Sequence, residues 1–228
     1  MKRRLLLLDV TAMAGDGVCI AGIDVDTAAT VRLNEPQPTA ALVRNLKLRP
    51  FDLLAIDSAP ARNAAAPHSE DHGWLPHSLR KSGPQDARDV ANALSPSAFV
   101  GVEDAFGAPA IRAGNRNHGW RAGSGVRSLA TIRVRYARAE VDRNGRLRLA
   151  FRDAADKYWE GVPFQDLAVR QHEHGCEECA SGYLAAVRRE FAINAGLIRV
   201  GLTRPFGADT DLACWLQVTN VIVPREHF

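Results

Sequence analysis

Arginines cluster between residues 112 and 152. This segment holds 11 of the 25 arginines in the chain and only two acidic residues, Glu140 and Asp142, which gives it a formal charge of +9. The remaining residues sum to −6, so the net charge of +3 conceals a polarised chain. A local excess of guanidinium groups is typical of surfaces that bind phosphate. The charge distribution therefore predicts a nucleic-acid contact in this segment.

Aromatic side chains lie within or beside this cluster. Trp120 falls inside it, and Tyr158 and Trp159 follow shortly after its end. Aromatic rings beside arginines can stack on the bases of a single strand while the arginines bind its phosphates. The predicted contact residues are Arg116, Trp120, Arg121, Arg127, Arg133, Arg135, Arg152, Tyr158 and Trp159. The alternative interpretation is a solvated sheet face, whose arginines pair with acidic residues elsewhere in the chain.

A second constellation could bind a metal ion. A C-x-x-C pair preceded by two histidines can supply the four tetrahedral ligands that zinc prefers. The residues are His172, His174, Cys176 and Cys179. Structural zinc sites usually join two separated ligand pairs, whereas this one would close a single loop. A polar loop with two reduced thiols, and hence no cofactor, is the alternative; further candidate ligands are Cys19, Cys214, His68, His72 and His77.

Three aspartates follow apolar runs that resemble strands. They are Asp9, Asp24 and Asp57. Asp9 and Asp57 would suit a ribonuclease H-like arrangement, in which carboxylates on the first and fourth strands hold Mg²⁺ for two-metal hydrolysis. A third carboxylate would have to come from Asp86 or Asp89. The alternative is that these aspartates begin turns, which is a common use of this residue.

Composition and the remaining motifs limit the function classes. Apolar residues make up 46% and charged residues 24%, as in an ordinary globular protein. The apolar run near the N-terminus has only four leucines before Asp9, too few for a signal peptide, and no run approaches a membrane span. Four cysteines do not form a secreted disulfide framework. We therefore expect a cytoplasmic protein without a membrane partner, and the sequence contains no phosphate-binding loop or nucleophile elbow.

The first half of the sequence predicts short strands around one helix. Strand-like runs lie at residues 4–10, 17–24, 29–34 and 51–57. A helix is expected over 39–48, with Thr39 as its N-cap and Pro50 beyond its end. Residues 59–97 read as a long surface excursion with a short helix at 84–94, followed by a candidate fifth strand at 97–103. The glycines and asparagines of 112–127 predict a flexible loop.

A hairpin follows in the second half. The expected strands span 128–141 and 146–152, joined by a three-residue loop that ends at Gly145 in the left-handed conformation. This register sets Leu147 opposite Val141 and Arg148 opposite Glu140, so apolar residues face each other and opposite charges pair. It requires a bulge near residues 136–138, where the apolar parity of the first strand changes.

The complete element order points to a duplicated small barrel. A third strand at 157–162, a helix at 177–194 and strands at 197–203 and 212–223 complete the second half. Three strands, a helix and two strands is the order of an OB-fold, a five-stranded barrel. We therefore expect a mainly β protein of two OB-like barrels in tandem. The first would occupy residues 1–110, with the excursion at 59–97, and the second 111–228, with the arginine-rich loop and hairpin.

Several short motifs resemble a prokaryotic dual OB-fold family. They are VCIAGI at 18–23, VRL at 31–33, PHSED at 67–71, RSL at 127–129, the segment 147–159, VGLTRP at 200–205 and WLQVT at 215–219. The resemblance implies nucleic-acid binding and a link to prokaryotic conflict systems. It brings no catalytic residues with it.

Together these observations favour a non-enzymatic module that binds single-stranded DNA or RNA through an arginine and aromatic face of the second barrel. The alternatives are a Mg²⁺-dependent nuclease that uses Asp9 and Asp57, or a protein-interaction module whose arginines meet an acidic partner. Fold alone does not choose among them, because OB-folds bind nucleic acids, proteins and sugars.

Overall fold

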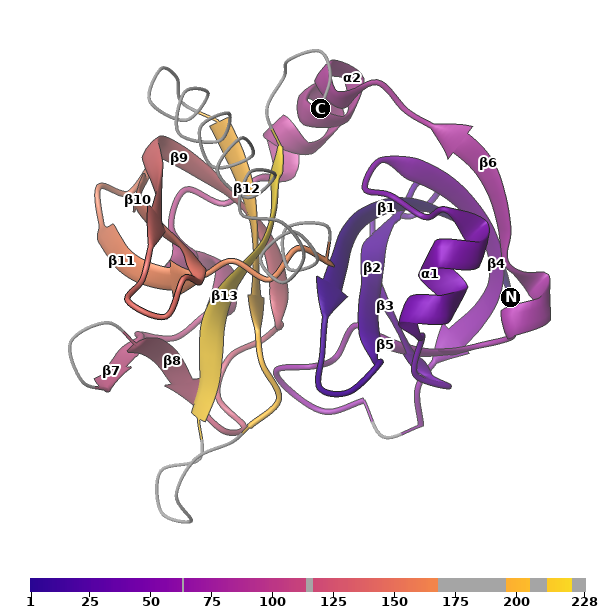
Figure 1. The fold of residues 1–228 in the computed structure, drawn as a ribbon, viewed down its shortest axis with the longest axis horizontal. Helices are drawn as coiled ribbons and strands as arrows, with labels where there is room; N and C mark the ends of the chain where they lie inside the picture. The colour runs from indigo at the N-terminus through magenta and orange to yellow at the C-terminus, as the bar shows by residue number, and fades with distance from the viewer. Residues whose placement is uncertain (63, 114–116, 168–195, 206–212, 223–228) are drawn as a thin grey trace.

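Two β-structures lie side by side in the computed structural model (Figure 1). The structure describes residues 1–62, 64–113, 117–167, 196–205 and 213–222. The N-terminal strands form a closed five-stranded barrel, and the C-terminal strands form a curled seven-stranded sheet. The protein is therefore mainly β with short helices, as the sequence predicted. No helix in the described part of the chain is long and apolar enough to cross a membrane.

The first barrel closes through its first strand. β1 pairs antiparallel with both β2 and β4, while β3 and β5 pair in parallel. This is the closure of an OB-fold, with the helix α1 between the third and fourth strands, and Thr39 caps α1 as predicted. The elements are β1 (Lys2–Ala12), β2 (Val18–Asp24), β3 (Thr30–Glu35), α1 (Ala40–Leu46), β4 (Asp52–Pro60) and β5 (Asp71–Trp74).

The prediction of a fifth strand at 97–103 is wrong. β5 lies within the supposed surface excursion, where it pairs with β3 and β4. Phe99 and Val102 instead pack into the core of the second sheet, and Phe99 bridges to Ile132 there. The remaining elements of this stretch are the 3₁₀ helix η1 (Pro76–Ser78), β6 (Arg80–Pro84), α2 (Ala87–Leu94), the 3₁₀ helix η2 (Ser95–Ser97) and α3 (Val102–Phe106).

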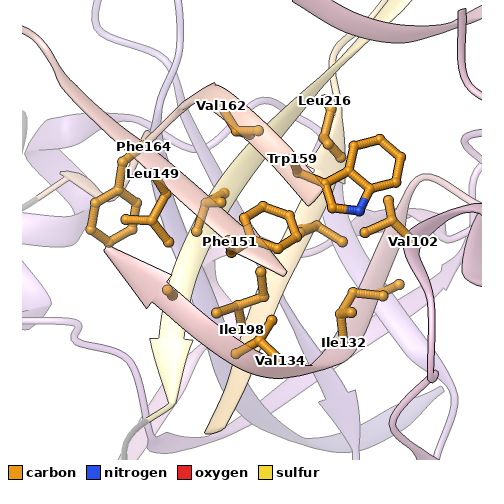
Figure 2. Close-up of a cluster of buried hydrophobic side chains, with 14 of the residues drawn as sticks. Val102, Ile132, Val134, Leu149, Phe151, Trp159, Val162, Phe164, Ile198 and Leu216 are labelled. Carbon is orange, nitrogen blue, oxygen red and sulfur yellow. The ribbon is translucent and has the colours of Figure 1, made fainter. Parts of the chain in front are cut away.

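The second sheet repeats the OB strand order. β9, β10 and β11 form a meander, and β12 returns beside β9 and pairs with β13. A parallel bridge between Phe164 and Val218 brings the end of the third strand to the fifth. Figure 2 shows the buried side chains that fill this curl, among them Phe151, Trp159 and Ile198. The strands are β9 (Leu129–Val141), β10 (Leu147–Asp153), β11 (Tyr158–Pro163), β12 (Gly196–Leu202) and β13 (Ala213–Ile222).

The predicted hairpin register is confirmed. Leu147 faces Val141 and Arg148 faces Glu140. Gly145 has a φ of 73°, the left-handed conformation that the three-residue loop requires. The register shift lies between Tyr136 and Val134, so the bulge falls at Arg135, just before the predicted segment. As a result Tyr136 points outward, away from the core face that holds Val134.

The predicted flexible loop at 112–127 is only partly correct. β7 (Ile111–Ala113) and β8 (Asn117–Arg121) form a small hairpin that extends the second sheet beside β13. Trp120 lies opposite Cys214, and both are fully buried. The glycines of this stretch suggested a loop, but burial of Trp120 stabilises β8 in its pairing with β13.

A buried ion pair joins the two barrels. Arg199 on β12 donates to both carboxylate oxygens of Asp9 on β1, at 2.6 to 3.2 Å. Thr219 donates its hydroxyl to Asp9 at 2.6 Å, and Arg199 donates to Thr131 at 3.1 Å. The side chains of Asp9 and Arg199 are 0% and 1% exposed. A charge buried this deeply is tolerated only because its hydrogen bonds are satisfied.

Removal of one partner of this pair should destabilise the protein strongly. We expect Asp9→Ala to lower the free energy of unfolding by about 3–5 kcal/mol, because it leaves the Arg199 guanidinium buried and uncompensated. Urea denaturation measures the change. The exposed pair Arg4–Asp26 is the control, and Asp26→Ala should cost less than about 1 kcal/mol. Equal losses in the two variants would contradict this role for the buried pair.

Candidate functional site

An exposed row of three side chains crosses the outer face of the second barrel. Arg152 on β10 lies opposite Tyr136 on β9 and opposite Tyr158 on β11. Both tyrosines are 40% exposed, and the Arg152 guanidinium lies 5.8 Å from the centre of the Tyr158 ring. We call Tyr136, Arg152 and Tyr158 the tyrosine row. It presents two aromatic rings with a cation between them.

Two further arginines, Arg135 and Arg138, lie near the tyrosine row. Arg135 lies 3.7 Å from the carboxylate of Asp156. Arg152 of the row lies 3.4 Å from the same carboxylate, so two cations share one anion. Attraction to Glu140 raises the pKa of the exposed Arg138 guanidinium, and the nearby phenols of Tyr158 and Tyr136 act in the same direction. The row therefore lies in positively charged surroundings.

Part of the arginine cluster is neutralised within the hairpin. Arg148 pairs with Asp142 at 3.0 Å rather than with Glu140 opposite it. Glu140 instead pairs with Arg138 at 2.5 Å. Arg148 and Glu140 thus face each other as predicted, but each side chain forms its ion pair with another residue. These pairs leave Arg138 accessible and Arg148 half-buried.

Trp120 and Trp159 were predicted to stack on bases, but both are core residues. Each is fully buried, and their rings stack on one another with centres 6.2 Å apart. The Trp159 indole donates to Asp153 at 2.8 Å, and that of Trp120 to the Ala108 carbonyl at 2.7 Å. In this arrangement neither ring can offer a face to a base. Burial of the largest apolar side chains outweighs their use on the surface.

The other predicted arginines are dispersed. Arg121 is exposed on β8, while Arg133 donates to the Ser95 carbonyl at 2.6 Å. Arg127 is half-buried and lies over the Phe99 ring at 4.6 Å. Arg116 lies outside the described residues, as do the four candidate zinc ligands, His172, His174, Cys176 and Cys179. The zinc hypothesis therefore stays a prediction.

Asp9 and Asp57 do not share a site. Asp57 lies opposite Lys2, and Asp9 follows seven residues further along β1, which corresponds to roughly 20 Å in a strand. Asp9 is also fully occupied by Arg199 and Thr219. No group of three or more metal-ligating side chains occurs among the described residues. The geometry gives no support to the two-metal arrangement.

A second polar centre lies at the junction between the barrels. Asp71 on β5 accepts from Arg32 on β3 at 2.6 Å and also pairs with Arg204, which follows β12. Arg32 in turn donates to Nδ1 of His68 at 2.8 Å. Burial lowers the pKa of His68 to about 3, and the guanidiniums of Arg32 and Arg204 add to the shift. His68 is therefore a neutral acceptor for Arg32. We call Arg32, His68, Asp71 and Arg204 the junction cluster.

Glu70 ties the same segment to the second barrel. One of its carboxylate oxygens accepts from the backbone N–H groups of Ser128 and Leu129, at 2.7 and 2.8 Å, where β9 begins. The carbonyl of Glu70 accepts from the N–H of Arg32 at 2.8 Å. The segment at 67–71 thus contacts both barrels. The Glu70 carboxylate binds the second barrel, and the Glu70 backbone carbonyl binds β3 of the first.

The motifs that suggested a family meet at this junction. VRL contains Arg32, PHSED contains His68, Glu70 and Asp71, and VGLTRP contains Arg204. The sequence model of the dual OB-containing domain matches residues 3–221. The chain belongs to the dual OB-containing domain family. No curated protein and no solved structure matches it.

The junction cluster of this dual OB-containing domain was not predicted from the sequence. Arg32 and Arg204 lie outside the arginine-rich segment, and Asp71 lies in the supposed surface excursion. Tyr136 was likewise missed, because its outward position depends on the bulge at Arg135. The usable signal was the position of Arg32, Asp71 and Arg204 inside the short motifs of the resemblance.

His68 should make the stability of this dual OB-containing domain depend on pH. Its pKa falls from 6.5 when unfolded to about 3 when folded, so the unfolded chain binds a proton first as the pH drops. Stability is therefore retained above about pH 6.5 and lost progressively below it. In urea denaturation, the free energy of unfolding of wild type should fall between pH 7 and pH 5. We expect this fall to be about 1 kcal/mol smaller in His68→Gln, a figure that allows for solvent screening.

The exposed His77 provides the control for this pH dependence. His77→Gln should keep the full wild-type loss between pH 7 and pH 5. An identical loss in His68→Gln and wild type would show that His68 does not titrate as its burial requires.

Proposed function

We propose that this protein binds single-stranded nucleic acid across the outer face of β9, β10 and β11. The observation that supports the proposal is the tyrosine row, in which Tyr136, Arg152 and Tyr158 lie side by side and exposed on three neighbouring strands. Base–aromatic stacking next to arginine is the usual means of holding a single strand. The row replaces the buried tryptophans as the stacking surface.

The position of the row within the fold supports this function. OB-folds bind oligonucleotides on the face of their second and third strands. In the second barrel these strands are β10 and β11, which carry Arg152 and Tyr158. Neighbouring strands are about 4.8 Å apart, so the two tyrosines stand about 10 Å from each other with the guanidinium between them. This spacing offers two stacking positions and one phosphate contact.

The first barrel cannot offer the same face. Its second and third strands are β2 and β3, and the outward-facing Ala21 and Arg32 on these strands are buried. Asp9 on the neighbouring β1 is bonded to the second barrel. An extended strand would have to displace these contacts. The open face of the second barrel is therefore the surface that we assign to nucleic acid.

The charges favour a nucleic acid over an acidic protein. Arg135, Arg138 and Arg152 surround the tyrosines, and their acidic partners are Asp156 and Glu140. Cations alone would serve an acidic protein surface equally well, but two exposed rings beside them also provide the stacking faces that bases use. Phosphates and bases alternate along a single strand, as cations and rings do here.

Substitutions in the row should weaken binding without unfolding the protein. In fluorescence anisotropy with a labelled oligouridylate or oligothymidylate, we expect Tyr158→Ala and Tyr136→Ala to weaken binding about 5- to 100-fold each, the range for loss of one stacked base. Arg152→Gln should reduce the slope of log K against log salt by about one contact. Thermal unfolding confirms that each variant is folded.

Arg44→Gln is the matched control, because it removes one exposed positive charge on α1 of the first barrel. It should bind like wild type apart from a small change at low salt. Failure of wild type to bind either oligonucleotide at low salt would overturn the proposed function. Equal weakening of binding in Arg44→Gln and Arg152→Gln would show that the oligonucleotide is held by nonspecific charge attraction and not by the tyrosine row.

A further inference from the structure

A cavity of about 470 Å³ lies between the two barrels, beside the junction cluster. The first barrel contributes β2, β3 and the loop after β1, and the second contributes the segment 202–205 and β13. Its volume falls in the range of small-molecule sites, about 300–1,000 Å³. The walls come from both barrels, which the ion pair between Asp9 and Arg199 holds together. The cavity is therefore a fixed feature of the paired barrels.

The cavity wall is positively charged. Arg32 and Arg204 both line it, and they share the single carboxylate of Asp71. No acidic residue is among the described residues that line the cavity. The Arg204 side chain is 44% exposed, so its guanidinium can turn toward a ligand in the cavity. Asp71 and the neighbouring Glu70 both attract the buried Arg32, so the positive charge open to an anion is the exposed guanidinium of Arg204.

The same wall offers amide groups that can recognise a base. Gln165, Gln217 and Asn34 line the cavity. Among the described residues, the side-chain amides of Gln165 and Gln217 have no hydrogen-bond partner. An amide carries a donor and an acceptor side by side, which matches the edge of a nucleobase. These groups can thus read a planar heterocycle.

Met13 and Pro205 supply apolar contacts to the cavity, whereas the side chains of the other apolar lining residues, Leu33 and Leu202, belong to the barrel cores. Flipped-out bases are held between apolar or aromatic side chains while their edges are hydrogen-bonded. The cavity therefore combines an anion site, amide donors and acceptors, and an apolar enclosure.

We propose that this cavity binds one phosphorylated nucleoside, with the phosphate at Arg204 and Arg32 and the base at Gln165 and Gln217. The ligand is either a free nucleotide or the terminal nucleotide of a strand, since both present the same chemistry. The site is distinct from the tyrosine row and does not depend on it. An anion without a base would leave the amides unused, and a neutral base would leave the exposed Arg204 guanidinium without an anion.

Isothermal titration of the full chain with the four ribonucleoside 5′-monophosphates tests the site. We expect at least one to bind at least tenfold more tightly than its nucleoside or inorganic phosphate. Arg204→Gln should weaken that binding at least tenfold because it removes the accessible guanidinium. Gln217→Leu should weaken it severalfold and reduce the difference between bases, while inorganic phosphate binding stays the same.

A variant outside the cavity separates this site from the proposed strand-binding face. Tyr136→Ala combined with Tyr158→Ala should lose binding of an oligonucleotide without a 5′-phosphate but keep nucleotide binding unchanged. Competition between the bound nucleotide and a short strand with or without a 5′-phosphate identifies the source. Displacement only by the phosphorylated strand indicates a strand end, and displacement by neither indicates a free nucleotide.

Three results would overturn the cavity proposal. The first is no binding of any of the four nucleotides at millimolar concentration. The second is equal binding of nucleotide and inorganic phosphate. The third is wild-type nucleotide affinity in both Arg204→Gln and Gln217→Leu, with each variant folded in thermal unfolding. None of these results bears on oligonucleotide binding by the tyrosine row, so the two proposals fail separately.

Discussion

The buried ion pair between Asp9 and Arg199 is the constraint on which the arrangement of the two barrels depends. Asp9 receives hydrogen bonds from Arg199 and Thr219, and Arg199 reaches Thr131 as well. All of these partners of Asp9 come from the second barrel. If the barrels shifted, both charges would lose hydrogen bonds while still buried, at a cost of several kcal/mol. An apolar interface could tolerate sliding, whereas this one is satisfied in a single position.

The fixed position has two consequences. It closes the outer face of the first barrel and leaves a cavity whose walls belong to both barrels. It also connects the segment 67–71 to β9, because Glu70 binds the backbone at Ser128 and Leu129. β9 continues from this contact through Thr131, where Arg199 binds, to Tyr136 in the tyrosine row. One strand thus joins the interface to the exposed face.

Local patterns in the sequence predicted the five main strands of the second barrel, β9 to β13, whereas the helix expected at 177–194 lies outside the described residues. Strict alternation along β10 and the glycine at position 145 determine the hairpin register, because the side-chain period and the turn chemistry are both local. The same reasoning failed for β5, whose sequence DHGW has no apolar alternation. Its polar side chains are buried by partners far along the chain, as Arg32 and Arg204 bind Asp71.

The candidate sites were harder to predict, for a related reason. Aromatic residues near arginines suggested stacking, but whether a ring is inside or outside depends on the register of the strand that carries it. Tyr158 and Trp159 are neighbours in sequence, and the pleat sends one outward and the other into the core. Asp9 and Arg199 are separated by 190 residues, so no local pattern could pair them.

The two barrels use the same fold in opposite ways. The face formed by the second and third strands carries arginine in both, as Arg32 in the first barrel and Arg152 in the second. Arg32 is buried, and Asp71 and His68 hold it in place, so it can act only on a ligand that enters the cavity. Arg152 is exposed and shares its one acidic partner with Arg135. Burial leaves the first face accessible only through the cavity, whereas the second face is open to solvent across β9, β10 and β11.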